Sequence, residues 1–105
     1  MEEFKSIDSA TAAWQTFSEG VEMLPLRAEP GANRVLLRFA PGRGYPVHQH
    51  TVAEEVYVIE GTYEDRGRQY GPGSYLYYPP GSTHTAFSST GCTFLVINNK
   101  VPEQG

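Results

Sequence analysis

Glycine and proline divide this chain into short segments, and this division constrains its fold more than any other feature. The 105 residues include 11 Gly and 8 Pro. Between these residues, apolar side chains alternate with polar ones or form short runs, and they do not recur at helical spacing. Many short strands separated by turn residues are typical of a closed barrel or a sandwich. The sequence therefore predicts an all-β domain, with strands at 21–26, 35–40, 55–60, 62–65, 68–70, 74–78 and 93–98.

The turn residues predict where the chain reverses. Arg66–Gly67 suits a tight hairpin, and Pro79–Gly81 forces a sharp corner because proline restricts the backbone and glycine frees it. The one segment with helical character is 9–19, where Ser9 is a suitable N-cap and the apolar Trp14 begins a three-residue spacing. We expect a short helix there.

Length and charge exclude several classes of function. With 105 residues the chain forms one domain, 1–105, without room for a second catalytic domain. Its 8 basic residues are scattered among 12 acidic ones, so we expect no nucleic-acid partner. The acidic amino terminus does not resemble a secretory signal, and no apolar run approaches the roughly 20 residues of a membrane span. We expect a soluble, cytoplasmic protein without a membrane partner. Cys92 is the only cysteine, and we expect it to pack as a small apolar residue.

All three histidines fall in two short blocks that suit a single metal site. In a strand, His48 and His50 project from the same face, and Glu54 returns to that face in even steps. The Pro79–Gly81 corner would bring His84 from a distant segment to the same point. We therefore predict four metal ligands, His48, His50, Glu54 and His84.

The donor set indicates the kind of metal. Imidazole nitrogen and carboxylate oxygen suit Zn, Fe, Mn, Ni or Co, whereas the absence of thiolates argues against a structural zinc site. Four protein ligands on an octahedral ion would leave two open positions for a ligand. Two alternatives stand beside this prediction. A single histidine in a strand is more often a surface or core residue than a ligand, and Glu55 could replace Glu54, although strand parity would turn Glu55 outward.

The two blocks resemble the signature motifs of the cupin superfamily. The first motif, at 42–61, matches at Gly42, His48, His50, Glu54 and Gly61. The second, at 73–88, matches at Gly73, Pro79, Gly81 and His84. It usually ends in Asn, and Ser88 stands there instead, which puts a turn contact in doubt rather than the metal. The stretches RFAPGRGYPVHQHTVAEEVYVIEGTYED and YGPGSYLYYPPGSTH resemble ChrR-like cupin domains. This resemblance implies a small jelly-roll β-barrel holding one divalent ion per chain, Fe(II), Zn(II) or Mn(II).

The fold implied by this resemblance serves several functions, and three candidate functions remain for this chain. The first is a non-haem metal-dependent dioxygenase acting on a small carbonyl or enol compound with O2. The second is a sensor resembling the C-terminal domain of ChrR-type anti-sigma factors, although those proteins carry an amino-terminal helical zinc domain for which this chain has neither the length nor the cysteines. The third is a metal-binding protein without turnover. No residue is assigned a catalytic or substrate-binding role.

The expected partners are a small molecule and a second copy of the chain. A small barrel with an exposed sheet edge often pairs with itself, and an outward aromatic such as Tyr57 could supply the contact. Arg38 and Arg43 precede the ligand block and could hold an anionic substrate, but a surface role is the simpler interpretation. The tyrosines at 57, 75, 77 and 78 lie in expected strands, where aromatics are favoured for packing alone.

Overall fold

The computed structural model describes residues 3–45, 48–49 and 51–98. Within these ranges the chain forms strands, turns and irregular segments but no helix. A helix capable of crossing a membrane is accordingly not found among the described residues. The strands in chain order are β1 (Gln15–Ser18), β2 (Val21–Glu29), β3 (Ala32–Phe39), β4 (Arg43–Gly44), β5 (His48–Gln49), β6 (Glu54–Gly61), β7 (Tyr63–Asp65), β8 (Arg68–Tyr70), β9 (Tyr75–Tyr78), β10 (Thr83–His84), β11 (Phe87–Ser88) and β12 (Cys92–Asn98).

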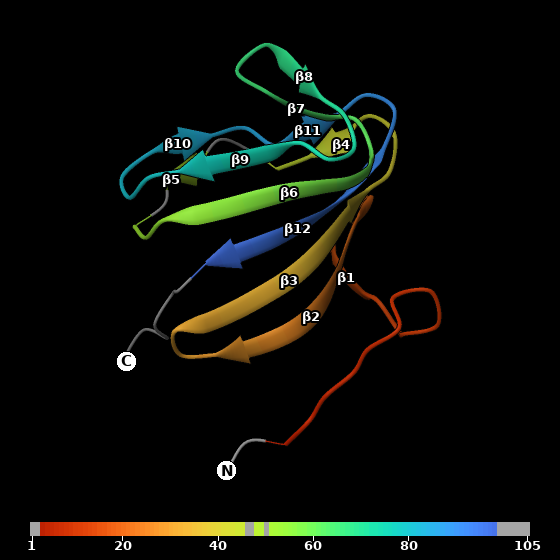
Figure 1. Ribbon diagram of the computed structural model, residues 1–105. Coiled ribbons are helices and arrows are strands. Elements are labelled where there is room, and N and C mark those ends of the chain that lie inside the picture. The colour runs from red at the N-terminus through yellow and green to blue at the C-terminus, as the bar shows by residue number, and fades with distance from the viewer. Residues whose placement is uncertain (1–2, 46–47, 50, 99–105) are drawn as a thin grey trace.

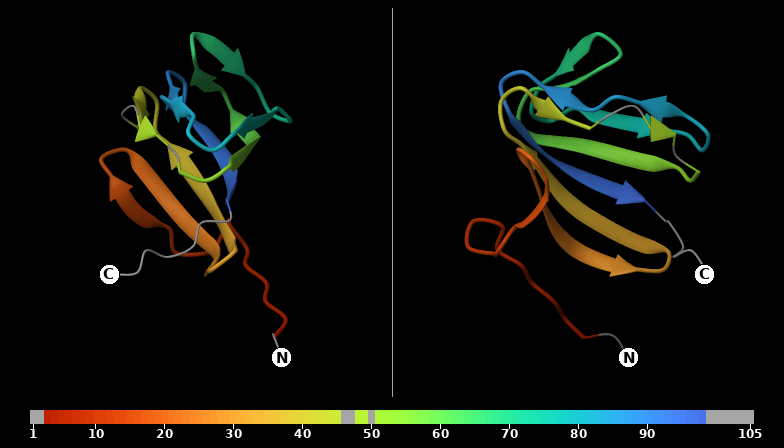
Figure 2. Two further views of the ribbon diagram at one scale, coloured as in Figure 1. Left: turned by 90° about the vertical axis from the view of Figure 1, so that its left-hand side faces the viewer. Right: turned by 180° about the vertical axis from the view of Figure 1, so that it is seen from behind.

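The strands form one large antiparallel sheet and two small ones (Figure 1). The large sheet has the order β1-β2-β3-β12-β6-β9. The small sheets have the orders β10-β5 and β4-β11-β7-β8. Figure 2 shows the small sheets lying together over one face of the large sheet, so that the domain has two layers. The predicted all-β class is confirmed.

The core lies between the two layers because side chains alternate along each strand. In β6, Val56 is fully buried whereas Tyr57 is 47% exposed on the opposite face. Phe94, in β12, packs edge-to-face against Phe39 and Tyr63, with ring centroids 5.1 and 4.9 Å apart. These aromatic contacts join β3 and β12 of the large sheet to β7, which belongs to the small sheet β4-β11-β7-β8.

All seven predicted strands are present, as β2, β3, β6, β7, β8, β9 and β12. The largest differences are at β2, which continues past the predicted end at 26 to Glu29, and at β3, which begins at Ala32, before the predicted start at 35. The predicted hairpin is also confirmed, with positive φ of 55° at Arg66 and 72° at Gly67. The two-residue strands β4, β5, β10 and β11 were not predicted, because segments this short contain no measurable period.

The predicted helix at 9–19 is wrong. Asp8 closes a single turn, in which its carbonyl accepts the N–H groups of Thr11 at 3.2 Å and Ala12 at 2.9 Å. The indole N–H of Trp14 then donates to the carbonyl of Ser9 at 2.9 Å. From Gln15 onward the chain is extended and pairs with β2. One apolar spacing of three residues does not make an amphipathic stripe, and pairing with the edge of a sheet satisfies this backbone instead.

Gly61 and Cys92 mark a close approach between the end of β6 and the start of β12. A Cβ at Gly61, where φ is +76°, would lie 2.1 Å from the carbonyl oxygen of Gly91, so only glycine fits. Cys92 is free and buried in the core, as predicted, and burial raises the pKa of its thiol to about 11. The thiol therefore stays protonated at neutral pH.

Candidate metal centre

Two of the predicted ligands lie opposite each other in the sheet formed by β5 and β10. The antiparallel register pairs His48 with His84 and Gln49 with Thr83. Directly opposed residues in such a pair have Cα atoms about 4.5–5.5 Å apart. The fold thus brings together two histidines from the two separate sequence blocks.

Glu54 begins β6 and faces the interior. Glu54 is only 6% exposed, and this burial raises the pKa of its carboxyl group from 4.5 to about 7. Glu55 faces the other side of the sheet, where its carboxylate accepts a hydrogen bond from the Tyr75 hydroxyl at 2.6 Å. Glu54 therefore has the inward orientation that strand parity predicted, and Glu55 does not.

Tyr78 links Glu54 to His84. The β6–β9 register places Glu54 opposite Tyr78. The ring of Tyr78 lies against the imidazole of His84, with ring centroids 4.2 Å apart and an interplanar angle of 32°. His84 is itself only 4% exposed. Glu54 and His84 are thus both neighbours of Tyr78 in the interior, Glu54 through strand pairing and His84 through the ring contact.

His50 lies outside the described residues, and β5 is described at His48 by its backbone alone. Among the side chains that the structure does describe, no three His, Cys, Asp or Glu groups gather closely enough to hold a metal ion. The set of four ligands therefore remains a prediction, of which the structure supplies the opposed positions of His48 and His84 and the inward carboxyl of Glu54.

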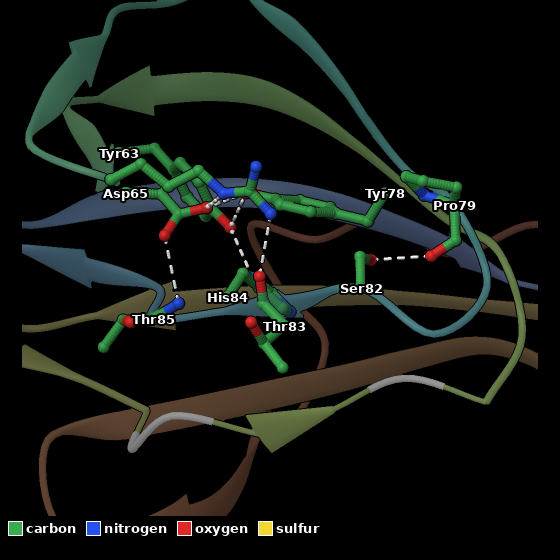
Figure 3. A network of polar contacts seen from close by, with 9 residues as sticks. Tyr63, Asp65, Tyr78, Pro79, Ser82, Thr83, His84 and Thr85 are labelled. Carbon is green, nitrogen blue, oxygen red and sulfur yellow. Dashed lines mark hydrogen bonds and ion pairs between the residues drawn. The ribbon is translucent and has the colours of Figure 1, made fainter.

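A chain of buried polar groups lies behind His84 (Figure 3). The Tyr63 hydroxyl is 3.3 Å from Nδ1 of His84 and 3.1 Å from the Tyr78 hydroxyl. The Tyr78 hydroxyl donates to Oδ2 of Asp65 at 2.7 Å, and the backbone N–H of Thr85 donates to Oδ1 at 3.0 Å. No functional meaning was assigned to Tyr63 or Asp65 from the sequence. Their alternation within the predicted strand 62–65 was the available signal, since both face inward in β7.

Tyr45 is a second interior phenol that sequence reasoning missed. It is half-buried and packs edge-to-face against Phe39, with ring centroids 5.3 Å apart. Burial, with a further contribution from the Glu54 charge, raises the pKa of Tyr45. Its hydroxyl is therefore a neutral group at physiological pH, close enough to Glu54 to sense the carboxylate.

Arg38 and Arg43 have the surface role that was the simpler interpretation. The guanidinium of Arg38 pairs with Glu22 at 2.8 Å and stacks 4.0 Å from the ring centre of Trp14. Arg43 pairs with Glu19 at 3.0 Å. All of these charged side chains are substantially exposed, and both arginines are engaged at the surface.

Ser88, the one departure from the cupin motifs, makes hydrogen bonds through its side chain and its backbone. This residue is fully buried, and its hydroxyl donates to the carbonyl of Thr62. Its own carbonyl accepts the N–H of Gly42 at 2.8 Å. The hydroxyl thus joins the end of the second motif to the residue that follows the first motif, and the backbone of Ser88 joins it to Gly42.

Solved structures with this fold come from several kinds of protein. A chain in the complex of SigE with the anti-sigma ChrR from Rhodobacter sphaeroides has 24% identity and a TM-score of 0.77, and the match covers 87% of this chain and 50% of that one. The present chain thus spans half the length of that relative. The polyketide cyclase RemF from Streptomyces resistomycificus has 19% identity and a TM-score of 0.83, covering 96% of this chain and 83% of that one.

An acetylacetone dioxygenase from Acinetobacter johnsonii has 18% identity and a TM-score of 0.79, and the match covers 98% of this chain and 84% of that one. At these identities the likeness establishes the shared cupin fold alone. Comparison with curated protein sequences gave no match. The family model of the ChrR cupin-like domain, in contrast, matches residues 2–102, nearly the whole chain. The chain therefore belongs to the ChrR cupin-like domain family.

Proposed function

We propose that this protein binds one divalent transition-metal ion, Fe(II), Zn(II) or Mn(II), through His48, His50, Glu54 and His84. The observation that carries the proposal is the register of β5 and β10, which opposes His48 and His84 although they come from separate sequence blocks. Membership in a cupin family supports the same assignment.

The residues present fit such an ion. Imidazole nitrogens with one carboxylate oxygen are a donor set that suits Fe, Zn and Mn. Burial disfavours the charged form of Glu54 and raises its pKa to about 7. A cation beside this carboxyl group would favour the charged form and offset the cost of burial. The interior position of Glu54 is thus one where a metal ion would stabilise the protein.

We further propose a dioxygenase-type reaction on a small carbonyl or enol compound. Its support is the near-complete coverage of this chain by the acetylacetone dioxygenase, which is named for a small dicarbonyl compound. When bound, the ion would supply Lewis acidity toward the substrate oxygen and redox chemistry with O2. Tyr45 keeps its proton because burial raises its pKa, and its hydroxyl could orient a carbonyl or enol oxygen near Glu54.

Oxygen uptake tests the dioxygenase reaction. We expect the Fe(II)-loaded protein to consume O2 when supplied with a compound from a panel of β-diketones, hydroxyaryl ketones, thiols and catechols. Zn(II)-loaded protein is the matched control, because zinc has no redox chemistry. Absence of substrate-dependent uptake by protein shown to contain iron would contradict the enzyme and favour a non-catalytic metal protein.

The second candidate function is a metal-dependent sensor. It is favoured by the family match and by the likeness to a chain from the SigE–ChrR complex. In this case a sigma factor or another regulatory protein would be the partner, and the metal site would change affinity for that partner rather than turn over a substrate. A cytoplasmic location suits either function, since the single cysteine is buried and forms no disulfide.

We also infer that the protein forms a homodimer through the outer face of β6 and β9. Four apolar or aromatic side chains are between 46% and 59% exposed on these strands, namely Tyr57, Ile59, Tyr75 and Tyr77. Tyr57 and Tyr75 are direct cross-strand partners, so the exposed surface is continuous. Covering this face with a second copy would remove it from water.

Sedimentation or light scattering at micromolar concentration should therefore give twice the chain mass of 11.6 kDa. The substitution Tyr57→Arg should shift the protein to the monomer, because it places a charge within the contact. Thr16→Arg, on the exposed edge strand β1, is the matched control and should leave the dimer intact. A monomeric wild-type protein, or a dimer that tolerates Tyr57→Arg, would contradict the proposed interface.

A further inference from the structure

The buried hydrogen bonds behind His84 run in one direction. Asp65, Tyr78, Tyr63 and His84 are each at most 5% exposed, so water does not compete for their polar atoms. They connect in the order Asp65, Tyr78, Tyr63 and His84 over distances of 2.7, 3.1 and 3.3 Å. Figure 3 shows these groups following one another from β7 and β9 to β10.

The carboxylate end determines the direction of each bond. The backbone N–H of Thr85 can only donate, and it donates to Oδ1 of Asp65. The Tyr78 hydroxyl donates to Oδ2 of the same carboxylate. A hydroxyl has a single proton, so the oxygen of Tyr78 can only accept from Tyr63. The proton of Tyr63 is then also used, and its oxygen must accept a hydrogen bond from Nδ1 of His84.

We propose that Asp65 is a positioning residue that acts through Tyr78 and Tyr63 to hold His84 as the tautomer with its proton on Nδ1. In this tautomer Nε2 carries the lone pair, and Nε2 is therefore the nitrogen with which His84 would coordinate a metal ion. This consequence for metal binding rests on the proposed function, whereas the assignment of the tautomer rests only on the hydrogen bonds.

The groups around the network favour the direction in which its hydrogen bonds donate. Burial raises the pKa of Tyr63 and of Tyr78, so both phenols retain the protons that the sequence of bonds requires. Arg66 lies beside the carboxylate, with Nε 3.8 Å from Oδ2 of Asp65, and donates to the carbonyl of Thr83 at 2.9 Å. Arg66 thus places a positive charge at the end of the network where both carboxylate oxygens of Asp65 accept hydrogen bonds.

The substitution Asp65→Asn should reverse every bond in the network. The N–H of Thr85 still requires an acceptor, so the amide oxygen of the new side chain must occupy the Oδ1 position and its NH2 group must face Tyr78. Tyr78 would then accept from the amide and donate to Tyr63, and Tyr63 would donate to Nδ1 of His84. We therefore expect His84 to change to the tautomer protonated on Nε2.

Nitrogen NMR of the metal-free protein measures this change directly. The chain has only three histidines, and the His84 resonances are assigned by their loss in His84→Gln. At about pH 8, where an ordinary imidazole is neutral, we expect a protonated Nδ1 in the wild type and a protonated Nε2 in Asp65→Asn. Tyr63→Phe should release the constraint and give a mixture, whereas Tyr57→Phe, a matched change on the outer face, should leave the wild-type tautomer.

Metal titration supplies a second measurement. We expect Asp65→Asn to weaken metal binding about tenfold, the usual effect of losing an orienting partner of a ligand. An Nε2-protonated wild type, or an Asp65→Asn protein that keeps Nδ1 protonated, would overturn the proposal. If the tautomer changes but the wild type binds no metal, the network stands and the proposed metal function fails. If the wild type binds metal but the tautomer does not change in Asp65→Asn, the proposed metal function stands and the proposed role of Asp65 fails.

Discussion

Substitution of His84 by alanine should reduce the metal content of the purified protein from about one ion per chain to none. His84 is buried, and its backbone pairs with that of His48 in the β5–β10 register, so the substitution removes one of the proposed ligands. The remaining ligands would bind an ion at least about 100-fold more weakly, since each ligand of such a site contributes strongly to affinity. Elemental analysis after incubation with Fe(II), Mn(II) or Zn(II) measures the result, and His48→Ala should show the same loss.

Thr83→Ala is the matched control for this experiment. Thr83 precedes His84 in β10 and is exposed, so its substitution should leave metal content unchanged. Thermal unfolding of the metal-free proteins separates loss of a ligand from loss of the fold. Wild-type protein that stays metal-free, or His84→Ala and His48→Ala proteins that fold and retain a full equivalent, would disprove the proposed site.

The metal-free protein should lose stability as pH rises from about 4.5 to about 7 because of Glu54. Its folded-state pKa is raised to about 7 from 4.5, so across this interval the folded state holds a proton that the unfolded state has released. The free energy of unfolding then falls by up to about 1.4 kcal/mol for each pH unit. Summed over the interval, the contribution of Glu54 is on the order of 3 kcal/mol. Denaturant unfolding at a series of pH values measures it.

Glu54→Gln should remove this part of the pH dependence, because an amide does not titrate. Glu55→Gln changes the net charge equally on the outer face of the same strand, and it should keep the wild-type slope. Adding metal should oppose the wild-type trend between about pH 4.5 and 7, since an ion beside the carboxylate favours its charged form. Equal slopes in wild type and Glu54→Gln would show that Glu54 is not desolvated as described.

The part of the fold that sequence could predict is the part with a measurable period. In β6 and β12, buried positions alternate with less buried ones over six residues, which is long enough to distinguish a strand from a helix. The pair β5 and β10 has two residues in each strand and is established by contacts between distant segments. The prediction of a helix at 9–19 was wrong because pairing with β2 outweighed a weak local preference for a helix.

In the candidate site, too, local patterns could be predicted from the sequence, whereas contacts between distant segments could not. Parity alone predicted that Glu54 faces inward and Glu55 outward, and burial confirms the orientation of both. That His48 lies opposite His84 depends on the register between two distant segments, which no local pattern encodes. The network behind His84 depends on how β7, β9 and β10 meet in three dimensions. Sequence could indicate that Tyr63 and Asp65 share a face, but not what that face would contact.

The position of β12 has a consequence for how the protein acquires its structure during synthesis. This strand is the last one described, yet it lies in the middle of the large sheet, paired with β3 on one side and β6 on the other. Until the ribosome has released Cys92–Asn98, the nascent chain contains two half-sheets with unpaired edges and without the central aromatic ring of Phe94. Such edges readily pair with other chains. Completion of the fold, and with it the site bordered by Glu54, must therefore wait until translation of the domain is nearly finished.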